Sequence, residues 1–253
     1  MEERFVPATP GQTQPPGGES AGLDGDTAAG LLGDSRALQI LTTEHWSLLS
    51  ARSLVYNEAF ARSGMFLAFL SATLLVLGLI STATGFSDGF LIVAAIVLAL
   101  DLFVGLATLG RISGASAEDI RYLQGMNRIR HAYLEMVPGL ERYFITTGYD
   151  DLESVVSFYG PTVARDSIGG ILHGMTTTPG MLGAICAAVA GGLAGILTVL
   201  ATRDPLLAGV VALMVLVITF TVIAAWGFRA VAAFDASLEA RFPRPAGGVP
   251  PER

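Results

Sequence analysis

The stretch IVLALDLFVG, residues Ile96–Gly105, places one carboxylate, Asp101, in the middle of an otherwise apolar run. The uncharged sequence continues on both sides until the next charges, Asp88 before it and Arg111 after it. A helix needs about 20 apolar residues to cross the hydrocarbon core of a bilayer. The stretch therefore predicts a transmembrane helix that carries an intramembrane acid.

The composition of the whole chain is typical of a membrane protein. Of its 253 residues, 52% are hydrophobic and 15% are charged, and the mean hydropathy is +0.58. A soluble domain carries about 25% charged residues. The formal net charge is −7, and there is no basic face of the kind that a nucleic-acid partner requires. The single cysteine, Cys186, excludes an intrachain disulfide.

Uncharged runs predict four membrane spans. They must be helical, because lipid offers no hydrogen-bond partner to an open backbone. The expected spans are Met65–Thr84, Gly89–Leu109, Met181–Ala201 and Pro205–Phe228.

The short connections Gly85–Asp88 and Thr202–Asp204 join these spans into two predicted hairpins. This topology puts both termini and the segment Gly110–Thr178 on one side of the membrane. Fourteen of the fifteen Arg residues lie on that side, and only Arg203 lies opposite. All fifteen basic residues are Arg and none is Lys, a usage that points to a GC-rich bacterial genome. Because an excess of Arg marks the cytoplasmic side, we expect a protein of the bacterial inner membrane with both termini in the cytoplasm.

The parts outside the spans differ in their expected order. An acidic tail rich in Pro and Gly lacks the apolar core of a signal peptide, so we expect it to be disordered, as we do the C-terminal tail. In the linker, Asp150–Tyr159 predicts a short helix, and Ser167–Thr178 is either interfacial or an ordinary loop. The expected parts are 1–35 (tail), 36–137 (first hairpin), 138–178 (linker), 179–242 (second hairpin) and 243–253 (tail).

The first hairpin is expected to continue into the cytoplasm. Residues 36–63 contain no Pro, and a set of apolar side chains from Leu38 to Phe60, with His45 among them, shares one stripe of a helix. After the second span, Ser116 can cap another amphipathic helix, which Pro138 should end. Each arm would extend roughly 42 Å beyond the bilayer. In such a hairpin Arg52 faces the turn after Asp119.

Five polar side chains lie on or beside the inner stripes of these two arms. Two His and a Glu can bind a metal ion, whereas a satisfied polar layer can fix the register of paired helices. Because the spacing matches no metal signature, we favour the register layer and expect neither a metal nor a cofactor. The five residues are Glu44, His45, Asn127, Arg130 and His131.

Asp101 is expected to point into the helix bundle. An aspartate at the bilayer centre costs about 3 kcal/mol on insertion scales, and no Arg or His lies within a span to pair with it. We therefore expect a protonated Asp101 that hydrogen-bonds to a hydroxyl of Ser71, Thr73 or Thr198. Its role is either structural, as a hydrogen bond that holds helices together, which we favour, or it is part of a proton or cation path.

Small residues recur every four positions in the third span, at Gly183, Ala187, Gly191 and Gly195. Such a ridge lets another helix approach closely, which is what holds helices together in lipid. The partner is either another span of the same chain, which we favour, or a second copy in a homo-oligomer.

The sequence carries no enzyme signature: G-x-S-x-G, the P-loop and H-E-x-x-H are all absent. We expect no catalytic residues. Two classes of function remain. One is an interaction or assembly protein that binds a cytoplasmic protein through its long hairpin. The other is a small channel, transporter or sensor that uses Asp101.

Three segments resemble bacterial, actinobacterial-type multi-pass membrane proteins to which no activity is assigned. They read LTTEHWSLLSARSLVYNEAFARSGMF (Leu41–Phe66), GMNRIRHAYLEM (Gly125–Met136) and HGMTTTPGM (His173–Met181). The resemblance covers most of Leu38–Phe242. It implies a four-span membrane protein and transfers no functional residue.

Overall fold

The structure is a computed structural model that describes residues 30, 32–159 and 176–245. Every regular element in these ranges is helical, which confirms the all-α prediction. Most of the predicted N-terminal tail and of Ser167–Thr178, and the end of the C-terminal tail, lie outside the described residues. The elements are α2 (Ser35–Thr84), α3 (Asp88–Met136), η1 (Leu140–Tyr143), α4 (Leu152–Val156), η2 (Ser157–Tyr159), α6 (Thr178–Thr202) and α7 (Pro205–Ser237).

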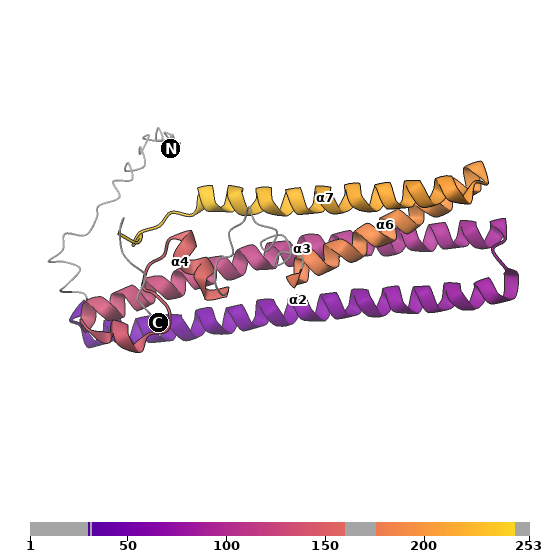
Figure 1. Ribbon diagram of the computed structural model, residues 1–253. Helices are drawn as coiled ribbons and strands as arrows, with labels where there is room; N and C mark the ends of the chain where they lie inside the picture. Colours follow the sequence, from indigo (N-terminus) through magenta and orange to yellow (C-terminus); the bar gives the residue numbers. More distant parts are fainter. Residues whose placement is uncertain (1–29, 31, 160–175, 246–253) are drawn as a thin grey trace, which may run out of the picture.

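Helices α2 and α3 lie side by side along nearly their whole length (Figure 1). Asp34 caps α2 by accepting a 2.9 Å hydrogen bond from the amide of Arg36. Gly85 ends α2 with a φ of 63°, a conformation that favours glycine. Two residues later Ser87 caps α3. The tight turn therefore follows from one glycine and one serine.

Helix α3 continues through Ser116 without a break, so the expected cap at this residue is wrong. The Ser116 hydroxyl instead donates to the carbonyl of Ile112 at 3.1 Å. Leu109 and Ile112 are 4% and 2% exposed, and their packing holds this stretch of α3 in register with its neighbours. The predicted second span and its extension form one helix, which ends just before Pro138.

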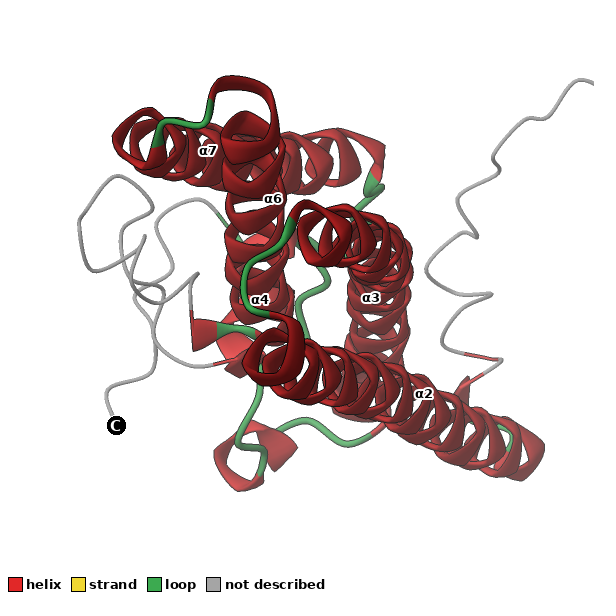
Figure 2. Ribbon diagram, turned by 90° about the vertical axis from the view of Figure 1, so that its right-hand side faces the viewer, coloured by secondary structure: helices red, strands yellow, loops and turns green. Residues whose placement is uncertain are grey.

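Helix α6 packs between α3 and α7 (Figure 2). Thr177 caps it by accepting from the amide of Gly180 at 3.3 Å. After α6, Arg203 adopts a φ of 60°, and Asp204 caps α7 by accepting from the amide of Leu206 at 2.9 Å.

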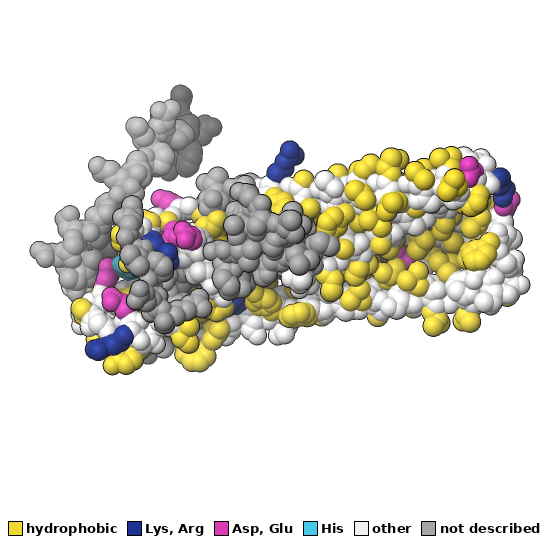
Figure 3. Space-filling view, viewed as in Figure 1, with side chains coloured by type: hydrophobic (Ala, Val, Ile, Leu, Met, Phe, Trp, Pro, Cys, Tyr) yellow, Lys and Arg dark blue, Asp and Glu magenta, His cyan; other side chains and the backbone are white. Residues whose placement is uncertain are grey.

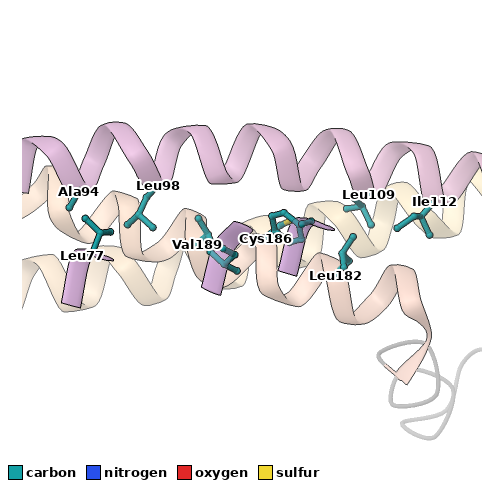
Figure 4. Packing of buried hydrophobic residues seen from close by; sticks show 10 residues of the cluster. Leu77, Ala94, Leu98, Leu109, Ile112, Leu182, Cys186 and Val189 are labelled. Carbon is teal, nitrogen blue, oxygen red and sulfur yellow. The ribbon is translucent and has the colours of Figure 1, made fainter. Parts of the chain in front are cut away.

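Three helices meet at the centre of the core (Figure 4). A Cβ atom on Gly105 of α3 would lie 2.8 Å from the sulfur of Cys186 on α6 and 2.8 Å from the ring of Phe66 on α2. Both side chains are buried. Gly105 is therefore required for α2 and α6 to approach α3 this closely.

Within the described part of the chain, four helices are long and apolar enough to cross a membrane: α2, α3, α6 and the first 26 residues of α7. On the face seen in Figure 3, hydrophobic side chains gather over the half of the molecule that holds both short helix connections. Large apolar side chains are exposed there, such as Leu79 at 63% and Leu206 at 78%. These features indicate a multi-pass membrane protein.

Ion pairs lie at both ends of this apolar belt. At one end Asp88 pairs with Arg203, which links the start of α3 to the α6–α7 connection. At the other end Glu58 pairs with Arg111 at 3.0 Å and with Arg62 at 2.9 Å. Asp88 and Arg111 are separated by about 34 Å along α3, close to the roughly 30 Å thickness of a hydrocarbon core.

Candidate functional site

Asp101 lies inside the apolar belt with no exposed surface. It is about 20 Å along α3 from Asp88 and about 15 Å from Arg111, and so lies near the middle of the belt. Its Oδ1 accepts a 3.4 Å hydrogen bond from the hydroxyl of Thr73 on α2. Its Oδ2 is buried and has no hydrogen-bond partner among the described residues.

The other two hydroxyls proposed for Asp101 bond within their own helices. Ser71 is exposed on α2 and donates to the carbonyl of Leu67 at 2.7 Å. Thr198 on α6 donates to the carbonyl of Ala194 at 2.8 Å. Of the three candidates, Thr73 is therefore the one whose hydroxyl reaches Asp101. One carboxyl oxygen remains able to exchange a proton or to bind a polar group that enters the bundle.

The outer halves of α2 and α3, residues 35–63 and 110–136, carry the predicted polar layer. Their closest charged contact is a buried ion pair, in which Arg52 Nε donates to Asp119 at 2.6 Å. The hydroxyl of Tyr56 donates to the other oxygen of Asp119 at 3.0 Å. The Arg52 guanidinium also lies 4.6 Å from the centre of the Phe158 ring, which brings α2, α3 and η2 together.

The five predicted layer residues divide into separate groups. Asn127 is 3% exposed and accepts a hydrogen bond from Arg130. His45 lies one turn before Leu48 on α2, and a Cβ atom on Gly125 of α3 would lie 3.0 Å from the Leu48 side chain. In two antiparallel helices this contact brings His45 level with the turn of α3 that carries Arg130. Burial and then the charge of Arg130 lower the pKa of the imidazole. Glu44 is exposed. The Nε2 atom of His131 lies 3.5 Å from a carboxylate oxygen of Glu135, on the next turn of α3.

This arrangement does not assemble the metal site considered above. Within the described residues, no group of three His, Cys, Asp or Glu side chains is placed to hold a metal ion.

A second polar centre, which the sequence did not predict, is formed around Asp150. Its side chain has no exposed surface, and it receives a 2.7 Å hydrogen bond from Nε of Arg128. It also accepts the backbone amides of Arg241 at 3.0 Å and of Phe242 at 2.7 Å. Asp150 thus holds residues 239–244, which we name the C-terminal strap, against α3.

Other groups complete the attachment of the C-terminal strap. Asp151 accepts the amide of Arg244 at 3.2 Å. The carbonyl of Glu239 accepts from Gln124 at 3.3 Å and from Arg128 at 2.7 Å. The amides of residues 241, 242 and 244 are all bonded to the Asp150–Asp151 pair, and Pro243 between them has no amide proton. The anchored segment therefore extends into the range assigned above to the C-terminal tail.

The electrostatics of Asp150 favour its charged form. Burial by itself would raise the pKa of this carboxyl, but the bonds from Arg128 and from two backbone amides outweigh it, and the pKa lies below its usual value. His131 covers the site, with its ring stacked on Phe242 at a centroid distance of 4.1 Å. The Asp150–Asp151 pair before α4 was the one feature of the local sequence that could have pointed to this site. Asp151 caps α4 by accepting a hydrogen bond from the amide of Ser154 at 3.1 Å.

The small-residue ridge of α6 faces α7. A Cβ atom on Gly183 would lie 2.9 Å from Ile223, and one on Gly191 would lie 2.7 Å from the carbonyl oxygen of Ala212. A Cβ atom on Gly195 would lie 3.2 Å from the Ala212 side chain. Ala187, the fourth residue of the ridge, has no exposed surface. A helix of the same chain occupies this ridge.

Comparisons with protein-family models, with curated proteins and with solved structures give no match to this chain. The function is therefore argued from the chain's own chemistry.

Proposed function

We propose that this chain is a bacterial cell-membrane protein made of two transmembrane hairpins, the first of which continues into the cytoplasm and binds a protein partner there. Both termini lie in the cytoplasm. The distribution of Arg supports this orientation, because Arg203 is the one basic residue at the end of the belt that carries the short connections. Reporter fusions at Ser87 and Arg203 should report a periplasmic location.

The observation that carries the proposed interaction is a stripe of exposed apolar side chains on the outer half of α2. Leu38 is 52% exposed, Trp46 63% and Phe60 63%. With Leu49 and Tyr56 they fall within about 80° around the helix axis. Contiguous apolar surface outside the membrane is a common mark of a protein–protein interface.

A photo-reactive amino acid at single positions of α2 tests this interaction in cells. We expect one discrete cross-linked product from Leu49 or Trp46. The matched control is Ser47, which is exposed on the opposite side of the same turns. An equal yield of the same product from Ser47, or no product from the stripe, would contradict the proposal.

A second function is favoured by Oδ2 of Asp101, for which the described residues offer no hydrogen-bond partner. As a small channel, transporter or sensor, the chain would use this carboxyl as a proton or cation site at mid-membrane. Ion flux into proteoliposomes is the test. Flux that is lost on Asp101→Asn would favour this second function, and inert liposomes would favour the interaction protein.

A further inference from the structure

Arg130 has no acidic partner among the described residues, in contrast to two nearby guanidinium groups of the outer halves of α2 and α3. Arg52 pairs with Asp119, and Arg128 pairs with Asp150. No carboxylate of the described residues lies within ion-pair distance of Arg130, whose hydrogen bond goes to the amide oxygen of Asn127. A guanidinium has five N–H donors, so most of its bonding capacity remains available.

The surroundings of Arg130 disfavour an unpaired positive charge. The side chain is partly buried, and burial followed by the charge of Arg52 lowers its pKa. Taking a charged group out of water is costly unless an opposite charge compensates it. The site therefore has a positive charge in excess and favours an anion beside it.

His45 offers a second polar atom at the same place. Its Nδ1 is buried and has no hydrogen-bond partner among the described residues. Burial and then the charge of Arg130 lower the pKa of the imidazole, so both act against its charged form in the absence of an anion. An anion that contacts both groups would accept a hydrogen bond from Nδ1 of His45 and would compensate the positive charge of the guanidinium.

The position of Asn127 fixes how Arg130 is presented. The amide nitrogen of Asn127 donates to the carbonyl of Tyr149 at 2.8 Å, which directs its oxygen toward Arg130. Arg130 is thus held through Nη1. Its remaining N–H groups, which lie in the plane of the guanidinium like the tines of a fork, can donate to two oxygens of a ligand. Phosphate and carboxylate oxygens match this fork geometry.

We propose that His45 and Arg130 form a binding site for a small phosphate-class oxyanion between the outer halves of α2 and α3. The ligand is a soluble anion and not a lipid headgroup. Arg130 follows Arg111 by 19 residues, which places it about 28 Å beyond the edge of the apolar belt. The headgroup layer extends only about 5–7 Å from the hydrocarbon core.

The experiment uses the full-length protein in neutral detergent, with inorganic phosphate as the probe and chloride at matched ionic strength as the reference. The ring resonances of His45, assigned with His45→Gln, are followed by NMR against pH, together with the thermal unfolding temperature. We expect millimolar phosphate to shift the apparent pKa of His45 upward and to raise the unfolding temperature. In Arg130→Gln, which can still bond to Asn127, both effects should disappear.

Two further variants and one lipid arm complete the test. Arg130→Lys keeps the charge but loses the fork, so phosphate should bind more weakly. Arg142→Gln, at an exposed position in η1, should respond as the wild type does. Nanodiscs containing phosphatidic acid should leave His45 unchanged in phosphate-free buffer. A wild-type protein that does not respond to phosphate, a response that survives Arg130→Gln, or a response to phosphatidic acid would overturn the proposal.

Discussion

Asp150 accepts the backbone amide of Phe242 at 2.7 Å, although the two residues are 92 positions apart in the chain. This bond attaches the C-terminal strap to the outer half of α3. Helix α7 otherwise packs mainly on α6. The strap thus connects the two helix pairs outside the apolar belt, in addition to the packing of α6 on α3 and the Asp88–Arg203 ion pair.

The first prediction concerns this bond. Asp150→Asn removes the charge that compensates Arg128 and weakens the bonds to both amides. We expect the free energy of unfolding to fall by about 2 kcal/mol or more, and trypsin to cleave after Arg241 faster. Denaturant titration in detergent and limited proteolysis measure the two effects. Glu153→Gln, at a carboxylate that is 73% exposed, should change stability by less than about 0.5 kcal/mol. Equal behaviour of the two variants would refute the role of Asp150.

The second prediction concerns pH. The pKa of Asp150 in the folded protein lies below the ordinary value of 3.8, so the unfolded state binds its proton first as the pH falls. The stability from Asp150 is therefore fully present above pH 3.8 and is lost as the pH falls through the lower, folded pKa. The difference in unfolding free energy between wild type and Asp150→Asn should stay constant from pH 7 to about pH 5 and shrink below pH 4. A difference that shrinks between pH 7 and pH 5 would contradict this assignment.

The third prediction concerns Asp101. We expect it to carry a proton at pH 7, because its one described hydrogen bond comes from Thr73 and no cationic side chain of the described residues pairs with it. Infrared spectra should show a protonated carboxyl band at pH 7 that is absent in Asp101→Asn. Thr73→Val should move this band and cost about 1 kcal/mol of stability. Loss of the band on raising the pH from 5 to 7 would show that Asp101 is ionised.

The fourth prediction concerns the close approach at Gly105. A Cβ atom at this position would contact Cys186 and Phe66 at 2.8 Å, so Gly105→Ala should destabilise the protein by about 1–3 kcal/mol. Gly110→Ala on the same helix meets nothing within 4 Å and should be neutral or slightly stabilising. Adding Cys186→Ala to Gly105→Ala should recover part of the loss, which a double-mutant cycle measures. Additive effects in that cycle would contradict the contact.

The fifth prediction compares two adjacent glycines of α6. A Cβ atom on Gly191 would lie 2.7 Å from a backbone oxygen of α7, whereas one on Gly192 meets nothing within 4 Å. Gly191→Ala should therefore separate α6 from α7 and lower the free energy of unfolding by about 1–3 kcal/mol. Gly192→Ala should leave it unchanged or slightly higher. Cysteine cross-linking between the two helices reports the separation directly.

The positions of the membrane-spanning helices could be predicted from the sequence, because in lipid a backbone must form its hydrogen bonds within each helix. Apolar runs between charges therefore locate helices without knowledge of their neighbours. The same local logic predicted the turn at Gly85 and the end of α3 before Pro138. The local sequence wrongly predicted that a new helix begins at Ser116. Helix α3 continues through this residue because Leu109 and Ile112 pack in the core and hold the helix there.

The pairing of side chains from distant segments was decided by the tertiary structure alone. Asp150 forms its strongest contacts with Arg128 on α3 and with backbone amides of the C-terminal strap, and backbone amides leave no pattern in the sequence. Arg128 and Arg130 are two residues apart and chemically identical, yet Arg128 pairs with Asp150 and Arg130 has no acidic partner in the part of the chain that the structure describes. Helix periodicity states which face a residue occupies, but only the fold determines which groups lie opposite that face.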